Sequence, residues 1–171
     1  MSRAPYDAAT AAARPGPPRG RDDRVAIRPM EGGDVAAVLG IERASFAVPW
    51  SEGTFRGLLR RRNARLFVAT DEADVVLGYA VLWFAGSEAE LGDLAVREEA
   101  RRRGIGRRLL AAILRTAAAE GATAVFLEVR ESNEAACRLY ETAGFEIIGR
   151  RPDYYVRPPE DALVMRCAVP R

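Results

Sequence analysis

Two side chains in the second half of the chain could take part in acid–base chemistry. Glu128 lies in the apolar run of residues 124–129, and Tyr140 follows it within the next predicted helix. Burial raises the pKa of a carboxyl group, which would make Glu128 a competent base near neutral pH. The residues alone leave a second interpretation open, in which Glu128 points out of the sheet and pairs with an arginine such as Arg130. For Tyr140 the alternative is packing in the core, as is usual for an aromatic residue in a helix.

A basic turn that contains two glycines precedes the longest amphipathic segment. Residues 91–96 have the pattern of a strand end, and residues 101–106 lead from a turn into a predicted helix. The first N–H groups of a helix lack intrahelical acceptors, and the helix dipole favours an anion there. Gly104 and Gly106 also remove side chains that would keep a phosphate from the backbone. We therefore expect a phosphate site here, although the turn could also be an arginine-rich loop before a surface helix. The apolar residues of this helix share one face: Ile105, Leu109, Ile113 and Ala117.

The composition restricts the possible chemistry. All 26 basic residues are arginine, and the chain contains no histidine. A histidine base, a histidine metal ligand and a lysine Schiff base are therefore excluded, and the catalyst must be Asp, Glu, Tyr, Cys or water. Cys137 and Cys167 are too few for a disulfide framework and too far apart for a metal motif, so we expect no metal. Without a histidine to activate it, Cys137 is not expected to act as a covalent nucleophile.

Charge and hydropathy narrow the class of protein. The net charge of +2 does not by itself indicate binding to nucleic acid. No apolar run approaches the length that spans a membrane, and the N-terminal segment lacks a signal-type apolar core. We expect a cytoplasmic enzyme or binding module.

The length of 171 residues and the 49% hydrophobic content suit one domain with a tail. Residues 1–23 are rich in Ala, Pro and Arg and are predicted to be disordered, while residues 24–171 form the domain. The order of the predicted elements indicates a mixed α/β domain with a central crossover. Strands are expected at residues 25–30, 65–69, 75–84, 124–129, 145–149 and 162–168. A further strand, which follows the turn at residues 87–90, is expected to end at residue 96. Helices are expected at residues 34–43, after Ser51, from 105 and at 133–142, with caps at Asp34, Ser51, Gly121 and Gly144.

Four further assignments concern a bulge, a cap and two loops. Gly78 could mark a bulge in its strand. Asn133 stands at a helix start, where it is most often a cap. Trp50, next to Pro49, is either a hydrophobic staple for the following helix or a wall that faces the substrate. Tyr154 and Tyr155 are assigned to a polar, proline-rich connection.

The glycine turn resembles the signature of the GCN5-related N-acetyltransferase (GNAT) family, Arg/Gln-x-x-Gly-x-Gly/Ala after a strand, with Arg101, Gly104 and Gly106 at the matching positions. Further motifs resemble the ribosomal-protein alanine N-acetyltransferase branch of that family. The likeness extends from about residue 25 to residue 167. The branch motifs are residues 49–52, 127–136, 139–141, 144–145, 154–155 and 160–162.

This resemblance implies a fold and a cosubstrate. The GNAT fold has a mixed, mostly antiparallel sheet of about six to seven strands with a splayed centre, flanked by about four helices. The strand that ends at Val96 would carry a bulge, and the Val96 N–H would polarise the thioester of acetyl-coenzyme A in the gap. The residues expected to hold acetyl-coenzyme A are Leu94, Ala95, Val96, Arg102, Arg103, Gly104, Ile105, Gly106, Arg107 and Asn133.

The resemblance also implies the roles of the reacting side chains. Glu128 would be the proton acceptor, directly or through water, and Tyr140 the proton donor to the leaving thiolate. The acceptor would lie between Pro49–Trp50 and Tyr154–Tyr155 as an extended N-terminal peptide. The expected function is direct acetyl transfer to the N-terminal alanine of a small-subunit ribosomal protein, the eighteenth, by a monomer. The alternatives are a GNAT enzyme with another amine acceptor and a catalytically silent coenzyme A-binding module.

Overall fold

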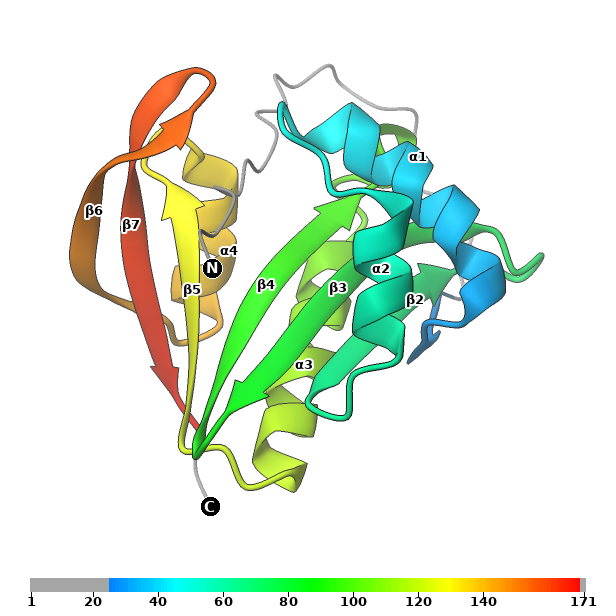
Figure 1. The fold of residues 1–171 in the computed structure, drawn as a ribbon, viewed down its shortest axis with the longest axis horizontal. Helices are drawn as coiled ribbons and strands as arrows, with labels where there is room; N and C mark the ends of the chain where they lie inside the picture. The colour runs from blue at the N-terminus through cyan, green and yellow to red at the C-terminus, as the bar shows by residue number, and fades with distance from the viewer. Residues whose placement is uncertain (1–24, 170–171) are drawn as a thin grey trace.

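The computed structural model describes residues 25–169, so the predicted tail at residues 1–23 lies outside the described residues (Figure 1). The helices are α1 (Val35–Ser45), α2 (Glu52–Leu59), α3 (Ile105–Ala119) and α4 (Glu134–Thr142). The strands are β1 (Ala26–Pro29), β2 (Ala64–Thr70), β3 (Val76–Ala85), β4 (Glu88–Val96), β5 (Ala124–Arg130), β6 (Glu146–Val156) and β7 (Pro159–Ala168).

The strands form one sheet of seven in the order β1-β2-β3-β4-β5-β7-β6. All neighbouring strands are antiparallel except β4 and β5, which run parallel and are joined through α3. This architecture confirms the predicted mixed, mostly antiparallel sheet with four helices.

The sheet opens between its two central strands. β4 pairs with β5 over only three residues, from Glu88 to Glu90, and the two strands then diverge (Figure 1). A bulge contributes to this divergence: Asp93 pairs with Val81 and Leu91 with Leu82, which leaves Gly92 outside the register with β3. Beyond Glu90, β4 therefore has a strand partner on its β3 side only. The predicted bulge and splay are confirmed.

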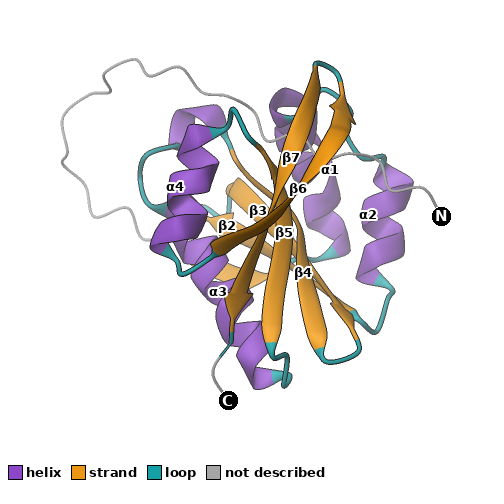
Figure 2. Ribbon diagram, turned by 90° about the vertical axis from the view of Figure 1, so that its left-hand side faces the viewer, coloured by secondary structure: helices purple, strands orange, loops and turns teal. Residues whose placement is uncertain are grey.

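Two apolar cores cover the two faces of the sheet. α1 and α2 lie on one face, and α3 and α4 lie on the other (Figure 2). Successive side chains of a strand point to opposite faces, so Val81 belongs to the α1–α2 core and Leu82 to the α3–α4 core. The predicted apolar stripe of α3 is fully buried in the second core. α3 thereby fixes the glycine turn at its N-terminus against the end of β4.

The predicted helix ends are confirmed with one exception. The Ser51 hydroxyl accepts the Thr54 N–H at 3.1 Å, and Gly121 and Gly144 follow their helices with positive φ. Asp34 does occupy the N-cap position of α1, but its side chain makes no capping bond to this helix. Asp34 instead accepts hydrogen bonds from the Glu31 N–H and from Arg28, which closes the preceding turn.

The structure corrects the placement of residues 153–155. Tyr154 and Tyr155 lie within β6, not in a connection. β6 continues past Pro152 because its pairing with β7 is interrupted between Arg151 and Tyr155, where Asp153 has a φ of 50°. A proline is tolerated there because β6 is an edge strand. These local irregularities hide the strand from a periodicity argument.

Gly78 of β3 lies close against the backbone of β4. The predicted bulge is found one residue away, at Leu77, which is left out of the β2–β3 register. A Cβ atom at Gly78 would lie 2.8 Å from the Ala95 carbonyl oxygen. We predict that Gly78→Ala destabilises the fold by about 1–3 kcal/mol, because backbone atoms must move apart. Urea unfolding measures this loss.

Gly57→Ala is the matched control. Gly57 lies inside α2, and a Cβ atom there would meet no atom within 4 Å. Since alanine is the better helix former, this variant should gain about 0.5–1 kcal/mol. Equal stability of the two variants would contradict the close approach at Gly78.

Candidate functional site

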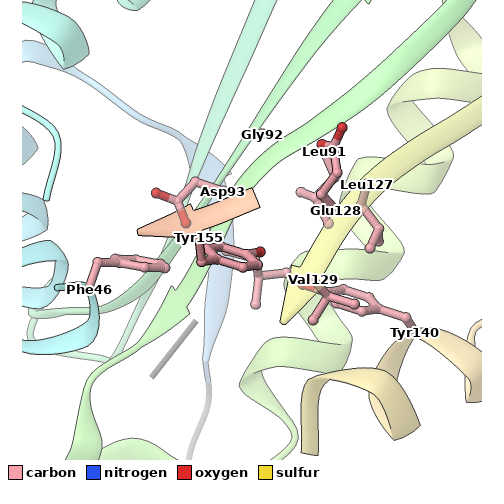
Figure 3. A pocket seen from close by; sticks show the side chains of 10 residues that line it. Phe46, Leu91, Gly92, Asp93, Leu127, Glu128, Val129, Tyr140 and Tyr155 are labelled. Atoms are coloured by element: carbon pink, nitrogen blue, oxygen red, sulfur yellow. The ribbon is translucent and has the colours of Figure 1, made fainter. Parts of the chain in front are cut away.

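A pocket lies where β4 and β5 diverge (Figure 3). It encloses about 310 Å³ of free space, part of which is open to solvent. The pocket brings Glu128, Tyr140, Leu94 and Tyr155 together, four of the residues predicted from the sequence. Its walls are formed by Phe46, Leu91, Gly92, Asp93, Leu94, Leu127, Glu128, Val129, Tyr140 and Tyr155.

Glu128 combines features of both interpretations of the sequence. Its side chain is only 5% exposed and lines the pocket, as a buried base requires. It also pairs with an arginine, but this is Arg151 of β6 at 3.2 Å and not Arg130. The half-exposed Arg151 keeps a positive charge beside the carboxylate while leaving Glu128 in the pocket wall.

Tyr140 likewise serves the core and the pocket. Its ring packs against Phe145 with centroids 5.7 Å apart, and the residue is buried. Burial raises the pKa of the Tyr140 phenol well above its usual value, with a smaller contribution from the charge of Asp93. The hydroxyl therefore stays protonated at neutral pH and can serve as a proton donor.

A buried arginine fixes the wall that contains Tyr155. Arg130 donates hydrogen bonds to Glu160 at 2.9 Å and to the carbonyls of Arg157 and Pro158 at 2.8 and 3.0 Å. Its guanidinium lies 4.1 Å from the centroid of the Tyr155 ring. These contacts join the end of β5 to the β6–β7 turn, so Tyr155 is held in one position.

An acidic cluster beside the pocket was missed by the sequence analysis. The Tyr79 hydroxyl contacts the Glu42 carboxyl and, at 3.1 Å, the Asp93 carboxyl. Glu42 also accepts the Trp50 N–H at 2.6 Å. The available signal was positional: Glu42 occupies the buried stripe of α1, where apolar residues are expected.

Burial dominates the electrostatics of this cluster. It raises the pKa of Asp93 well above the usual aspartate value, and the neighbouring Glu42 charge raises it further. Burial also raises the pKa of Glu42, against the lowering effect of the hydrogen bonds from Trp50 and Tyr79. Two adjacent buried carboxyl groups cannot both ionise readily, so the pair retains a proton near neutral pH.

The glycine turn has the backbone geometry of an anion site. Arg102 and Gly104 have φ values of 62° and 75°, and the first-turn N–H groups of α3 lie directly after them. Gly106 allows α3 to pack closely against Leu139 of α4, because a Cβ atom at Gly106 would lie 3.4 Å from the Leu139 side chain. Arg102, Arg103 and Arg107 are exposed beside the turn, whereas the Ile105 side chain is buried beneath it.

Two motif residues perform structural tasks. The Arg101 guanidinium donates to the Val96 carbonyl at 3.0 Å and so ties the glycine turn to the end of β4, which includes Leu94 and Ala95. Asn133 is buried, and its side chain caps α4 by accepting the Ala136 N–H at 3.2 Å. Contacts from these residues to a cosubstrate stay predictions.

Pro49 and Trp50 lie outside the pocket walls. Trp50 precedes the α2 cap and packs on Phe55, with centroids 5.5 Å apart, in the positions of a hydrophobic staple. Its ring also stacks on the Trp83 ring, with centroids 6.1 Å apart. The staple interpretation is confirmed, and a role for these two residues in acceptor binding stays a prediction.

Other kinds of site find little support in the described part of the chain. Burial raises the pKa of the Cys137 thiol, which disfavours the nucleophilic thiolate. Residues 25–169 contain no group of three acidic, cysteine or histidine side chains arranged to hold a metal ion. No helix in this range is long and apolar enough to cross a bilayer.

Sequence comparison gives matches over most of the chain. The model of the acetyltransferase (GNAT) family matches residues 35–145. A protein of Salmonella typhimurium LT2, named ribosomal protein bS18-alanine N-acetyltransferase, is 37% identical over 134 residues, which cover 77% of this chain and 89% of the relative.

Solved structures share the fold along nearly their whole length. The ribosomal-protein-S18-alanine N-acetyltransferase of Escherichia coli matches with a TM-score of 0.79 and 32% identity, covering 86% of this chain and 95% of that one. Ard1 from Thermoplasma volcanium also matches with a TM-score of 0.79, at 29% identity, covering 86% of this chain and 99% of that one.

Proposed function

This chain belongs to the GNAT family of acetyltransferases, and from that premise we propose that it transfers the acetyl group of acetyl-coenzyme A to the N-terminal alanine of ribosomal protein bS18. The observation that carries the proposal is the pocket at the β4–β5 splay, where Glu128 and Tyr140 line one cavity. The acceptor is supported by the names of the relatives from Salmonella typhimurium and Escherichia coli.

The residues at the glycine turn fit the cosubstrate. Its diphosphate would lie on the first-turn N–H groups of α3, beside the exposed Arg102, Arg103 and Arg107. Its pantetheine arm would follow the edge of β4 that lacks a strand partner beyond Glu90. When bound, acetyl-coenzyme A supplies the acetyl group as a thioester, and N–H groups on this edge, among them that of Val96, would stabilise negative charge on the carbonyl oxygen.

The proton transfers follow from the two pocket side chains. An α-ammonium group has a pKa near 8, so a base must remove a proton before the amine can attack. Glu128 accepts that proton, directly or through water, and Arg151 stabilises its anionic form beforehand. Tyr140 returns a proton to the leaving thiolate, since its hydroxyl is protonated at neutral pH. It regains a proton from the newly acetylated nitrogen, which loses its second proton as the amide forms. The raised pKa of the Cys137 thiol favours direct transfer over a cysteine intermediate.

Mass spectrometry of an acceptor panel tests the proposed function. The panel contains the N-terminal peptide of bS18, the same peptide starting with Ser or Met, and an N-terminally blocked peptide with one Lys. We expect acetylation at the α-amine of the alanine peptide at the highest kcat/KM. Preferred acetylation of the Lys peptide would show another acceptor class, and no transfer to any amine would indicate a silent coenzyme A-binding module.

Removing either proton-transfer group should slow the chemical step. Glu128→Gln and Tyr140→Phe keep the shape of each side chain, so we predict a loss of about a hundredfold or more in kcat and little change in the Kd of acetyl-coenzyme A. Steady-state kinetics and calorimetry measure the two quantities. If both variants turned over at the wild-type rate, neither side chain would transfer a proton.

A pair of glycine variants tests the diphosphate site. Gly104 and Gly121 have φ values of 75° and 80°, and a Cβ atom at either position would meet no atom within 4 Å. Alanine should therefore strain both positions similarly, by about 1–2 kcal/mol. Only Gly104→Ala should also obstruct the diphosphate, raising the Kd of acetyl-coenzyme A about tenfold, the effect of one lost hydrogen bond to a charged group. Equal Kd values for the two variants would count against the site.

A further inference from the structure

The acidic cluster of Glu42, Tyr79 and Asp93 extends to the pocket through one member only. Asp93 lines the pocket, whereas Glu42 and Tyr79 are buried behind it and are not among the wall residues. Figure 3 shows the Asp93 carboxyl projecting from β4 on the side where the rings of Phe46 and Tyr155 lie. The reaction derived above uses Glu128 and Tyr140 and leaves this carboxyl without a task.

The hydrogen bonds of the cluster fit a pair of carboxyl groups that share one proton. Tyr79 has one hydroxyl hydrogen but contacts two carboxyl oxygens, so one carboxyl must carry a proton to satisfy both contacts. The other carboxyl can then ionise, and an ammonium group beside Asp93 favours the arrangement in which Glu42 holds the proton and Asp93 carries the negative charge. Within residues 25–169, neither Glu42 nor Asp93 forms an ion pair with an arginine. A buried negative charge of this kind is stabilised by a cation that enters the pocket.

A second observation points to a ligand at the same place. Tyr155 is 1% exposed, and its hydroxyl has no hydrogen-bond partner among the described residues. Tyr155 lines the pocket together with Asp93, and Arg130 holds its ring in position. Buried hydroxyl groups are rarely left without partners, so a polar ligand group is expected between these side chains.

We propose that Asp93 binds the α-ammonium group of the acceptor peptide and thereby selects a cationic N-terminus. The inference rests on the proposed function and adds the residue that recognises the amine. Glu128 is less suited to this task, because Arg151 already neutralises its carboxylate. Recognition and proton removal are then divided: Asp93 holds the ammonium group on the α1–α2 side of the gap, and Glu128 accepts its proton.

The test compares two peptides that differ only in the amine. One is a hexapeptide with the bS18 N-terminal sequence, and the other has propionyl in place of its first alanine. Calorimetry with coenzyme A present measures both Kd values without turnover. The wild-type protein should bind the peptide with the amine about ten- to a hundredfold more tightly than the propionyl peptide. This is the range expected for a hydrogen bond to a charged group. Asp93→Asn should reduce that preference to about threefold or less, with the Kd of acetyl-coenzyme A unchanged.

Glu42→Gln is the matched control, because it removes a carboxyl from the same cluster but not from the pocket wall. It should keep most of the preference for the amine. An equal loss in both variants would indicate a merely structural cluster and overturn the proposal, as would full preference in Asp93→Asn. If Asp93→Asn does not fold, a crystal structure of the wild-type protein with coenzyme A and the hexapeptide tests the proposal. The peptide amine should lie within about 3.2 Å of the Asp93 carboxyl. A longer distance would overturn the proposal.

Failure of the proposed acceptor is a separate result. It would appear in the acceptor panel as acetylation of a different amine. The binding comparison would then use that amine and its des-amino analogue, with the same expected effect of Asp93→Asn and the same result against it.

Discussion

The short pairing between β4 and β5 is the constraint on which the rest of the structure depends. Three residues of β4 hold the two halves of the sheet together, and the bulge at Gly92 turns the remainder of β4 away from β5. A Cβ atom at Gly92 would lie 2.1 Å from the Trp83 ring, so the bulge position accommodates only glycine in this packing. The result is an unpaired strand edge inside a stable domain, which natural sheets normally avoid or cover.

The two halves of the sheet supply different parts of the site. β4 carries Asp93 and ends at the glycine turn, while β5 and α4 carry Glu128 and Tyr140. The Arg130 contacts brace the β5 half, and the apolar stripe of α3 braces the β4 half. On one face of the sheet the core shared by α3 and α4 joins the two halves, while the strands on either side of the gap do not pair beyond Glu90.

The sequence predicted the fold and part of the site. The i, i+4 stripe of α3, the Ser51 cap and the apolar strand around Glu128 are local signals, and each led to the correct element. The length of β6 was not predictable in this way, since its bulges and Pro152 interrupt the alternation that identifies a strand. The roles of the site residues stay predictions, although the structure does place Glu128, Tyr140 and Tyr155 in one pocket.

The acidic cluster shows why tertiary contacts could not be predicted from local sequence patterns. Tyr79 and Asp93 lie on the consecutive strands β3 and β4, whereas Glu42 lies on α1, and no spacing rule brings α1 to this hairpin. A glutamate in the buried stripe of α1 was the one local sign, and its partner could be identified only from the packing of α1 on β3 and β4. The Arg151 partner of Glu128 escaped for the same reason, because β6 was predicted to end before it.

Amide hydrogen exchange tests most directly whether the unpaired edge of β4 is the binding site. The account predicts that acetyl-coenzyme A slows exchange most strongly in two segments, residues 91–96 of β4 and the first turn of α3, and leaves β1 and β2 little changed. Protection spread evenly over the domain, or confined to segments outside these two, would contradict it.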